Sequence, residues 1–199
     1  MSPSEILEFW FADTLTSGPY SGTHSQLWFR KDADFDAEIE RRFGSLPEAA
    51  LRGELDAWRD EPASTLALVI VCDQFPRNLY RGSARAFEFD PFAREVACEA
   101  IDKGLDEQLH PIQAVFLYLP LEHSEDVALH DRCLQLFERL EERAPAALRP
   151  RIESFCGYAR SHGEIIRRFG RYPHRNALLD RAPTPEEAAY LDSGGETFS

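Results

Sequence analysis

The sequence predicts an all-α fold in a single domain, and three observations support this prediction. N-terminal helix caps recur along the chain, apolar residues repeat at helical spacing, and no segment shows the alternation typical of a half-buried strand. The 199 residues are the size of one domain, and a composition that is 43% hydrophobic with 14 Phe can supply its core. We expect the domain to span residues 1–192 and residues 193–199 to form a flexible tail.

The first two predicted helices lie in the N-terminal quarter of the chain. Ser2–Glu5 has the spacing of a capping box, with a proline at the first helical position, and it leads into an apolar stretch. Phe35, Ile39 and Phe43 recur every four residues, so they share one face of a second helix, which Gly44 can end.

The next predicted helix is apolar on all sides. Leu66–Cys72 lies between Pro62 and Pro76, and the residues that flank it are compatible with a helix rather than a strand. Phe75 precedes a proline, and residues in that position tend to leave the α region. We therefore expect this helix to break at Phe75.

Four further helices are predicted in the rest of the chain. Asp90-Pro91 opens the first, and Ser124 is a natural N-cap for a long charged helix that runs to about Arg143. An apolar stripe marks the third, and Thr184–Glu187 caps a short last helix. The stripe of the third helix consists of Ile152, Phe155, Cys156 and Ala159.

The charge balance and the absence of recognisable motifs exclude several classes of function. The net charge is -13, from 22 Lys+Arg against 35 Asp+Glu, so we expect no binding to nucleic acid or to anionic membranes. No apolar run approaches the ~20 residues that span a bilayer, and the first residues lack a basic start and an apolar core, so we expect neither a membrane span nor a signal peptide. The four cysteines form no C-x-x-C pair. We expect a cytoplasmic protein with no metal and no cofactor.

The first motif that carries chemistry is Asp73–Gly82, where the apolar helix ends. It presents Asp73, Arg77, Asn78 and Arg81 together. A buried charge must be paired, so the simplest interpretation of Asp73 is an internal ion pair with an arginine. One carboxylate cannot satisfy the ten N–H donors of two guanidinium groups, which leaves the arginines as candidates for binding a ligand.

The second motif is Leu119–Asp126, which also follows an apolar run. Glu122 and His123 precede the predicted cap of the long helix and are not required by it. A carboxylate beside an imidazole can serve as a general acid–base pair or as metal ligands. A di-metal carboxylate site is disfavoured, because Glu107 to His110 is the only Glu-x-x-His in the chain and a proline follows it.

The third motif is His162–Asn176, which is rich in arginine. Residues 149–175 contain seven arginines and two acids, a balance of +5 in an otherwise acidic chain. A turn that contains proline and is rich in Arg, His and Asn can cradle an anion, although the same arginines could instead pair with acidic helices of this chain. The candidate residues are His162, Arg168, Arg171, His174, Arg175 and Asn176.

Together the three motifs resemble the bacterial family called domain of unknown function 924, over about residues 6–191. Phe9-Trp10-Phe11 and Trp28-Phe29 also fit this family. The resemblance implies an all-α fold like that of tetratricopeptide repeats, with antiparallel helix pairs in a right-handed superhelix, although the 34-residue repeat consensus is missing here. It implies no activity, cofactor or catalytic set.

Three functions remain open from the sequence. The first is a helical binding module whose Arg- and His-lined pocket holds a carboxylate, a phosphate or an acidic peptide, with Asp73 and Glu122 orienting the arginines. The second is a metal-independent hydrolase or lyase, in which Glu122 with His123, or His162 with His174, is the acid–base pair. The third is purely structural, with the motifs forming internal salt-bridge networks. A homodimer could form through exposed aromatic residues, and Trp10, Trp28 and Trp58 are the candidates, although they fit a core equally well.

Overall fold

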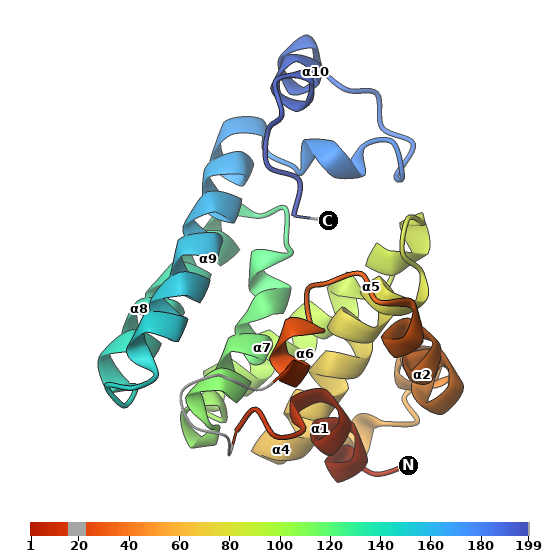
Figure 1. Cartoon of the computed structure of the whole chain (residues 1–199), viewed down its shortest axis with the longest axis vertical. Helices are drawn as coiled ribbons and strands as arrows, with labels where there is room; N and C mark the ends of the chain where they lie inside the picture. Colours follow the sequence, from red (N-terminus) through yellow and green to blue (C-terminus); the bar gives the residue numbers. More distant parts are fainter. Residues whose placement is uncertain (16–22, 199) are drawn as a thin grey trace.

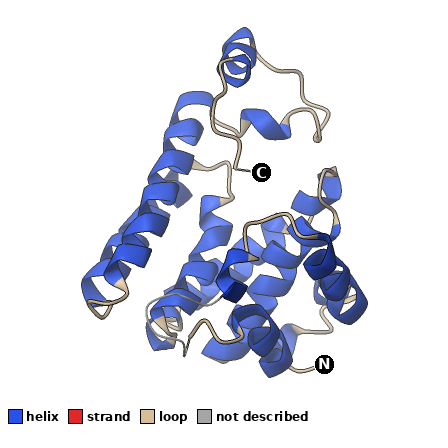
Figure 2. Ribbon diagram, in the orientation of Figure 1, coloured by secondary structure: helices blue, strands red, loops and turns tan. Residues whose placement is uncertain are grey.

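The computed structural model describes residues 1–15 and 23–198, and every regular element within these ranges is a helix (Figure 1 and Figure 2). The predicted all-α single domain is therefore confirmed. The α-helices are α1 (Pro3–Phe11), α2 (Ala33–Phe43), α3 (Leu46–Leu51), α4 (Pro62–Val69), α5 (Phe75–Leu79), α6 (Asp90–Asp102), α7 (Pro111–Glu122), α8 (Val127–Arg143), α9 (Arg149–Phe169) and α10 (Pro185–Asp192). The shorter turns are η1 (Thr23–Gln26), η2 (Asp56–Arg59), η3 (Ile70–Gln74), η4 (Ala84–Phe87), η5 (Asp106–Gln108) and η6 (Pro173–Arg175).

The N-terminal half is organised around the apolar helix α4, which packs against α1, α6 and α7. The predicted capping box opens α1: the Ser2 hydroxyl accepts from the Glu5 backbone N–H, and the Glu5 carboxylate accepts from the Ser2 N–H at 2.6 Å. In α2 the predicted face of Phe35, Ile39 and Phe43 is buried. Local caps and apolar spacing thus determine these helices, as the sequence predicts.

The helix that starts at Pro62 does not break at Phe75, so that prediction is wrong. Phe75 keeps helical dihedrals (φ -58°, ψ -41°), and its N–H bonds to the carbonyl of Ile70 in the π-helical turn η3. A proline inside an α-helix collides with the carbonyl four residues before it. The wider π turn accommodates Pro76 without a break and places Asp73 inside the protein.

α7, α8 and α9 form an antiparallel layer in which α8 packs against both of its neighbours (Figure 1). The N-cap of α8 is Asp126, not Ser124 as predicted, and its carboxylate accepts from the N–H groups of Ala128 and Leu129 at 2.8 and 3.3 Å. Ser124 lies two residues before this cap, in the turn that follows α7, where its N–H bonds to the Leu121 carbonyl.

The core is rich in aromatic rings. Trp10 lies edge-on to Phe75 and Phe116, with centroids 5.8 and 5.7 Å apart, and the Trp28 Nε1–H donates to the Trp10 carbonyl at 2.7 Å. Trp10 and Trp28 are buried, so neither contributes to a dimer interface, and Trp58 is half-buried. No helix in residues 1–15 and 23–198 is long and apolar enough to cross a membrane.

The chain beyond α9 folds back over one end of the helical layer (Figure 1). The predicted capping box of Thr184 and Glu187 opens α10, which packs against η6. The Phe198 ring then stacks on His162, with centroids 3.5 Å apart. Residue 199 of the predicted tail lies outside the described part of the chain, and the flexibility of this tail stays a prediction.

Candidate functional site

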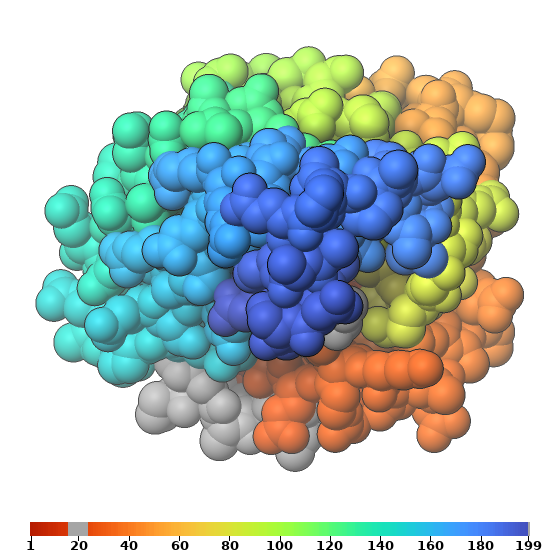
Figure 3. Space-filling view, turned by 90° about the horizontal axis from the view of Figure 1, so that it is seen from above, coloured from red at the N-terminus to blue at the C-terminus, as the bar shows by residue number. Residues whose placement is uncertain are grey.

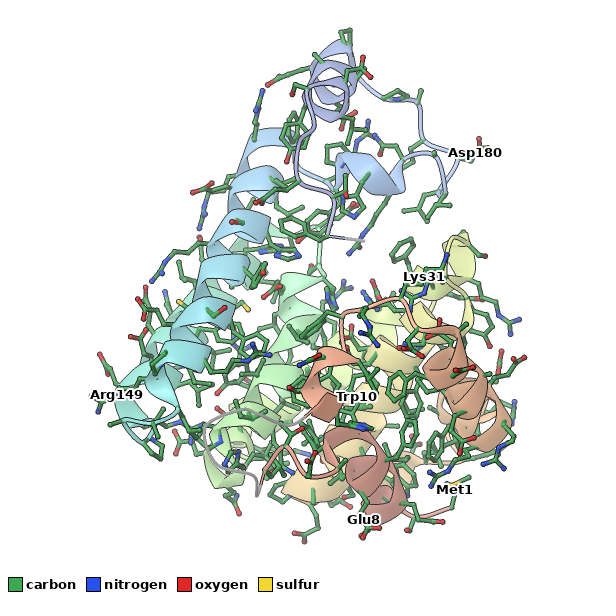
Figure 4. The ribbon with its side chains drawn as sticks, in the orientation of Figure 1. Met1, Glu8, Trp10, Lys31, Arg149 and Asp180 are labelled. Carbon is green, nitrogen blue, oxygen red and sulfur yellow. The ribbon has the colours of Figure 1, made fainter. Side chains whose placement is uncertain are left out.

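Side chains from all three motifs meet where the C-terminal end of α7 faces η3, the start of α6 and η6. In Figure 4, Lys31 and Asp180 both lie to the right of this end, Lys31 on the N-terminal half and Asp180, higher up, on the C-terminal arm. Seen from above, the dark-blue C-terminal segment lies between the cyan helices and the yellow-green segment that contains η4 (Figure 3). We call the residues that meet here the central cluster: Asp73, Arg77, Asp90, Glu122, His123, His162, Tyr172, His174 and Arg175.

Asp73 and His123 form a close pair that links the first motif to the second. The Asp73 Oδ1 lies 2.7 Å from the His123 Nδ1, and the Gln74 amide donates to the Asp73 Oδ2 at 2.6 Å. The Asp73 side chain is fully buried, and burial alone would raise its pKa, but Arg77 and His123 outweigh burial and hold the pKa below its usual range. Burial and the Arg77 charge lower the pKa of His123. At neutral pH the pair is therefore a carboxylate and a neutral imidazole.

Arg77 links this pair to the start of α6. Its Nη1 and Nη2 donate to the two carboxylate oxygens of Asp90 at 2.8 and 3.1 Å, and its Nη1 also lies 3.3 Å from the Asp73 Oδ1. A bidentate pair of this kind is strong and fixes the orientation of both partners. The structural interpretation of the first motif therefore holds for Arg77, whose partners are acids of the same chain.

Arg175 approaches the same acids from η6 and is bound much less completely. Its Nη1 donates to the His123 carbonyl at 3.0 Å and lies 3.7 Å from an oxygen of Asp90. Its Nε is buried and has no hydrogen-bond partner among the described residues. The guanidinium group lies between the rings of Phe87 and Tyr172, 4.6 and 4.4 Å from their centroids. Burial, and then the Arg77 charge, lowers its pKa.

Glu122 and His162 form a second buried pair. The Glu122 Oε1 lies 3.1 Å from the His162 Nδ1, which also lies 2.8 Å from the Tyr158 carbonyl. Burial, and then the Asp73 charge, raises the pKa of Glu122 to about 8, and burial lowers the pKa of His162 to about 3. Both groups are therefore neutral at pH 7. Because the Tyr158 carbonyl can only accept, the Nδ1 carries the proton of His162, and the acid proton of Glu122 belongs on Oε2.

His174 and the C-terminal segment border this pair. The His174 Nδ1 is buried without a partner in the described ranges, and burial lowers the pKa of His174 to about 4. The Phe198 ring stacks on His162 and lies edge-on to His174, with centroids 6.5 Å apart. The C-terminal segment therefore covers two of the histidines that the sequence predicts as candidates.

The remaining predicted site residues lie outside the central cluster, in internal pairs. Asn78 and Arg81 bind Asp36 of α2, at 2.7 and 3.1 Å. The others pair with acids of α10: Arg168 binds Glu186, while Arg171 and Asn176 bind Glu187. For these residues the structural interpretation is the simpler one. Within residues 1–15 and 23–198, no three His, Cys, Asp or Glu side chains are placed to hold a metal ion.

Three members of the site were missed by the sequence analysis. Asp90 has the sequence signal of a helix start, beside a proline, and only the fold shows that it also binds Arg77. The Tyr172 hydroxyl donates to the Glu122 carbonyl at 2.6 Å, and its position within the third motif was the available signal. Phe198 lies in the segment predicted to be a tail, and no sequence pattern indicates its contact with His162.

The comparisons with known proteins agree with this all-α fold. The family described as bacterial protein of unknown function (DUF924) matches residues 6–195. A solved structure, that of the protein of unknown function ATU0120 from Agrobacterium tumefaciens, is 39% identical with a TM-score of 0.81, and the match covers 96% of this chain and 97% of that one. No curated protein matches the chain. The chain belongs to the DUF924 family of bacterial proteins of unknown function.

Proposed function

We propose that this protein binds a small anion, a carboxylate or a phosphate, or the acidic end of a peptide, at the central cluster. One observation carries the proposal: Arg175 is 7% exposed and its Nε has no partner among the described residues. A buried donor without a partner costs ~1–3 kcal/mol. A bound anion that accepts from this guanidinium would remove that cost.

The other charges of the central cluster favour Arg175 over Arg77 as the anion-binding group. Arg77 already holds both oxygens of Asp90 and lies close to Asp73. Arg175 has five N–H donors and, in the described part of the chain, donates one hydrogen bond, to the His123 carbonyl. Glu122 is neutral at pH 7, so it adds no negative charge that would repel an anion.

The arrangement of helices supports a module of this kind. We infer that the antiparallel helices α7, α8 and α9 continue with their neighbours as a right-handed superhelix like that of tetratricopeptide repeats, which presents a concave surface to ligands. A homodimer stays a prediction, to be checked by the mass of the protein in solution.

The test measures binding of inorganic phosphate and of succinate by thermal shift and calorimetry. A ligand at 100 times its dissociation constant adds about 2.7 kcal/mol to the free energy of unfolding. We expect a rise in Tm for the wild type and for the control Arg168→Gln, because Arg168 is exposed, lies outside the central cluster and forms an ion pair with Glu186. We expect no rise for Arg175→Gln, because the planar donor group is lost.

A second variant covers the case in which Arg175→Gln does not fold. Arg175→Lys keeps the charge but loses the planar set of donors, so we expect at least ~10-fold weaker binding. If neither phosphate nor succinate raised the Tm of the wild type, the proposal would be overturned. If Arg175→Gln also lowered the free energy of unfolding by ~3 kcal/mol or more, the structural interpretation would replace it.

A further inference from the structure

The pair of Asp73 and His123 has no use in a site that only binds an anion. Asp73 is fully buried and ionised, and its negative charge opposes the binding of any anion nearby. The charge is nevertheless maintained by three contacts: Gln74 at 2.6 Å, His123 at 2.7 Å and Arg77 at 3.3 Å. A buried carboxylate aimed at an imidazole is the arrangement that orients a histidine for proton transfer.

The hydrogen bond determines the proton position on His123. The ionised Asp73 oxygen can only accept, so the Nδ1 carries the proton and the Nε2 presents a lone pair. The His123 side chain is 15% exposed, and its Nε2 has no hydrogen-bond partner within residues 1–15 and 23–198. The atom that can accept a proton is therefore the one that is free to meet water or a ligand.

The backbone conformation around Asp73 also indicates a functional role for the pair of Asp73 and His123. The π-helical turn η3 is a rare conformation, and such turns inside α-helices are frequent at functional sites. Here the turn buries Asp73 within reach of His123, which is the C-cap residue of α7. Arg175 holds the carbonyl of the same His123, so the candidate base and the candidate anion-binding group are in contact.

The nearby side chains limit the chemistry that this base can support. Within the described residues the His123 side chain contacts Asp73 through its Nδ1, and we assign no nucleophile of the protein to this pair. Water or the bound molecule must then give up the proton. Glu122 precedes His123 in the chain, and its carboxyl group, whose Oε1 lies 3.1 Å from the His162 Nδ1, can donate a proton.

We propose that the central cluster hydrolyses an ester that carries a carboxylate, with His123 as general base, Asp73 as its positioning residue and Glu122 as proton donor. The His123 Nε2 takes a proton from water, whose oxygen bonds to the acyl carbon. The C–O bond to the alcohol breaks, and the departing oxygen takes the proton of Glu122. Solvent then carries the proton from His123 back to Glu122. Recognition of the carboxylate by Arg175 rests on the proposed function.

The test compares 4-nitrophenyl hemisuccinate, which is anionic, with the neutral 4-nitrophenyl acetate, by release of 4-nitrophenolate. We expect kcat/KM at least ~10-fold higher for the hemisuccinate, and His123→Gln to lower it ~100-fold or more. The control is His110→Asn, because His110 caps the far end of α7 and asparagine caps equally well, so its rates should equal those of the wild type.

Asp73→Asn tests the positioning role. The amide removes the charge that raises the pKa of His123, so the acid limb of the pH–rate profile should move to lower pH while the plateau falls ~10-fold or more. The ¹⁵N chemical shifts of the His123 ring should also show that the Nδ1–H tautomer is no longer the favoured one. A variant that lowered only Tm, with the profile and tautomer unchanged, would assign Asp73 a merely structural role.

Failure of catalysis and failure of anion binding give different results. Equal ester hydrolysis by the wild type and a folded His123→Gln would overturn the catalytic proposal, whatever succinate binding shows. A different result would overturn only the anion site. In that case hydrolysis depends on His123, but its rate is the same for both esters and is unchanged in Arg175→Lys. Such a result would still support His123 as the general base. We expect Arg175→Lys to lower only the rate with hemisuccinate.

Discussion

Glu122 and Asp73 are two buried carboxyl groups of one cluster, and their pKa values move in opposite directions. Asp73 lies beside Arg77 and receives hydrogen bonds, so its ionised form is favoured despite burial. Glu122 is buried without a cation bound to it and feels the Asp73 charge, so its neutral form is favoured. A pair of carboxyl groups separated in this way can act as base-orienting group and acid at the same pH.

The raised pKa of Glu122 predicts that the free energy of unfolding falls as pH rises towards about 8. A raised pKa contributes stability that is present below the unfolded value of 4.5 and is lost as pH rises through about 8. His162 and His174 have lowered pKa values, so they reduce the free energy of unfolding only when pH falls below 6.5. Between pH 6.5 and 8 the free energy of unfolding should fall by roughly 1–2 kcal/mol.

The measurement is urea unfolding as a function of pH, with Glu122→Gln as the matched variant. Glutamine keeps the shape of the neutral acid, so this decline should vanish in the variant. An identical decline in both proteins would show that Glu122 is already ionised at neutral pH.

At the scale of the elements, the site depends on how helices end. α7 ends at Glu122, and the carbonyls at this end are bound from η6 and from the residue before it: the Tyr172 hydroxyl donates to the Glu122 carbonyl and the Arg175 Nη1 donates to the His123 carbonyl. Helix ends leave unpaired carbonyls that must find donors. The donors that satisfy α7 are therefore the same residues that bring the third motif to the second.

The start of α8 gives a prediction at the same scale. Asp126→Ala should lower the free energy of unfolding by ~1 kcal/mol, because the Asp126 carboxylate accepts from two N–H groups of the first turn. The comparison variant is Ser124→Ala, which should cost less, since Ser124 does not cap this helix. Chemical denaturation measures both, and the reverse order of the two effects would restore Ser124 as the cap.

At the scale of the whole molecule, the C-terminal segment covers the end where the central cluster lies. Phe198 stacks on His162 with a centroid separation of 3.5 Å, and the Tyr190 hydroxyl donates to the Glu196 carbonyl. These contacts cover His162 from one side. Removal of the segment should therefore change access to the site and uncover the small cluster of Ile165, Ile166 and Tyr172, without disturbing the main core, which is built from α1 to α9.

Phe198→Ala tests this cover. Diethyl pyrocarbonate acylates neutral imidazoles that solvent can reach, and peptide mass spectrometry reports each histidine separately. We expect His162 to react ~10-fold faster in the variant, with His110 unchanged and stability altered by less than ~1 kcal/mol. Equal rates in both proteins would mean that the segment already leaves His162 open in solution, as expected for a flexible tail.

Most helices and all three polar motifs of this protein could be predicted from the sequence, because both depend on residues that are close together in the chain. The capping boxes at Ser2 and Thr184 and the apolar face of α2 were predictable, since caps and helical periodicity act within four residues. Asp73, Glu122, His123 and Arg175 could be selected as candidates by residue type and by position at helix ends.

Which of those candidates meet depends on the packing of the helices. Asp73 and His123 are 50 residues apart in the chain, and Arg175 lies 52 residues beyond His123, so no local pattern records their contacts. The same holds for Arg171 and Arg81, which the fold pairs with Glu187 and Asp36 instead. Ion pairing and pKa values depend on distance and burial, which arise only when the chain is packed.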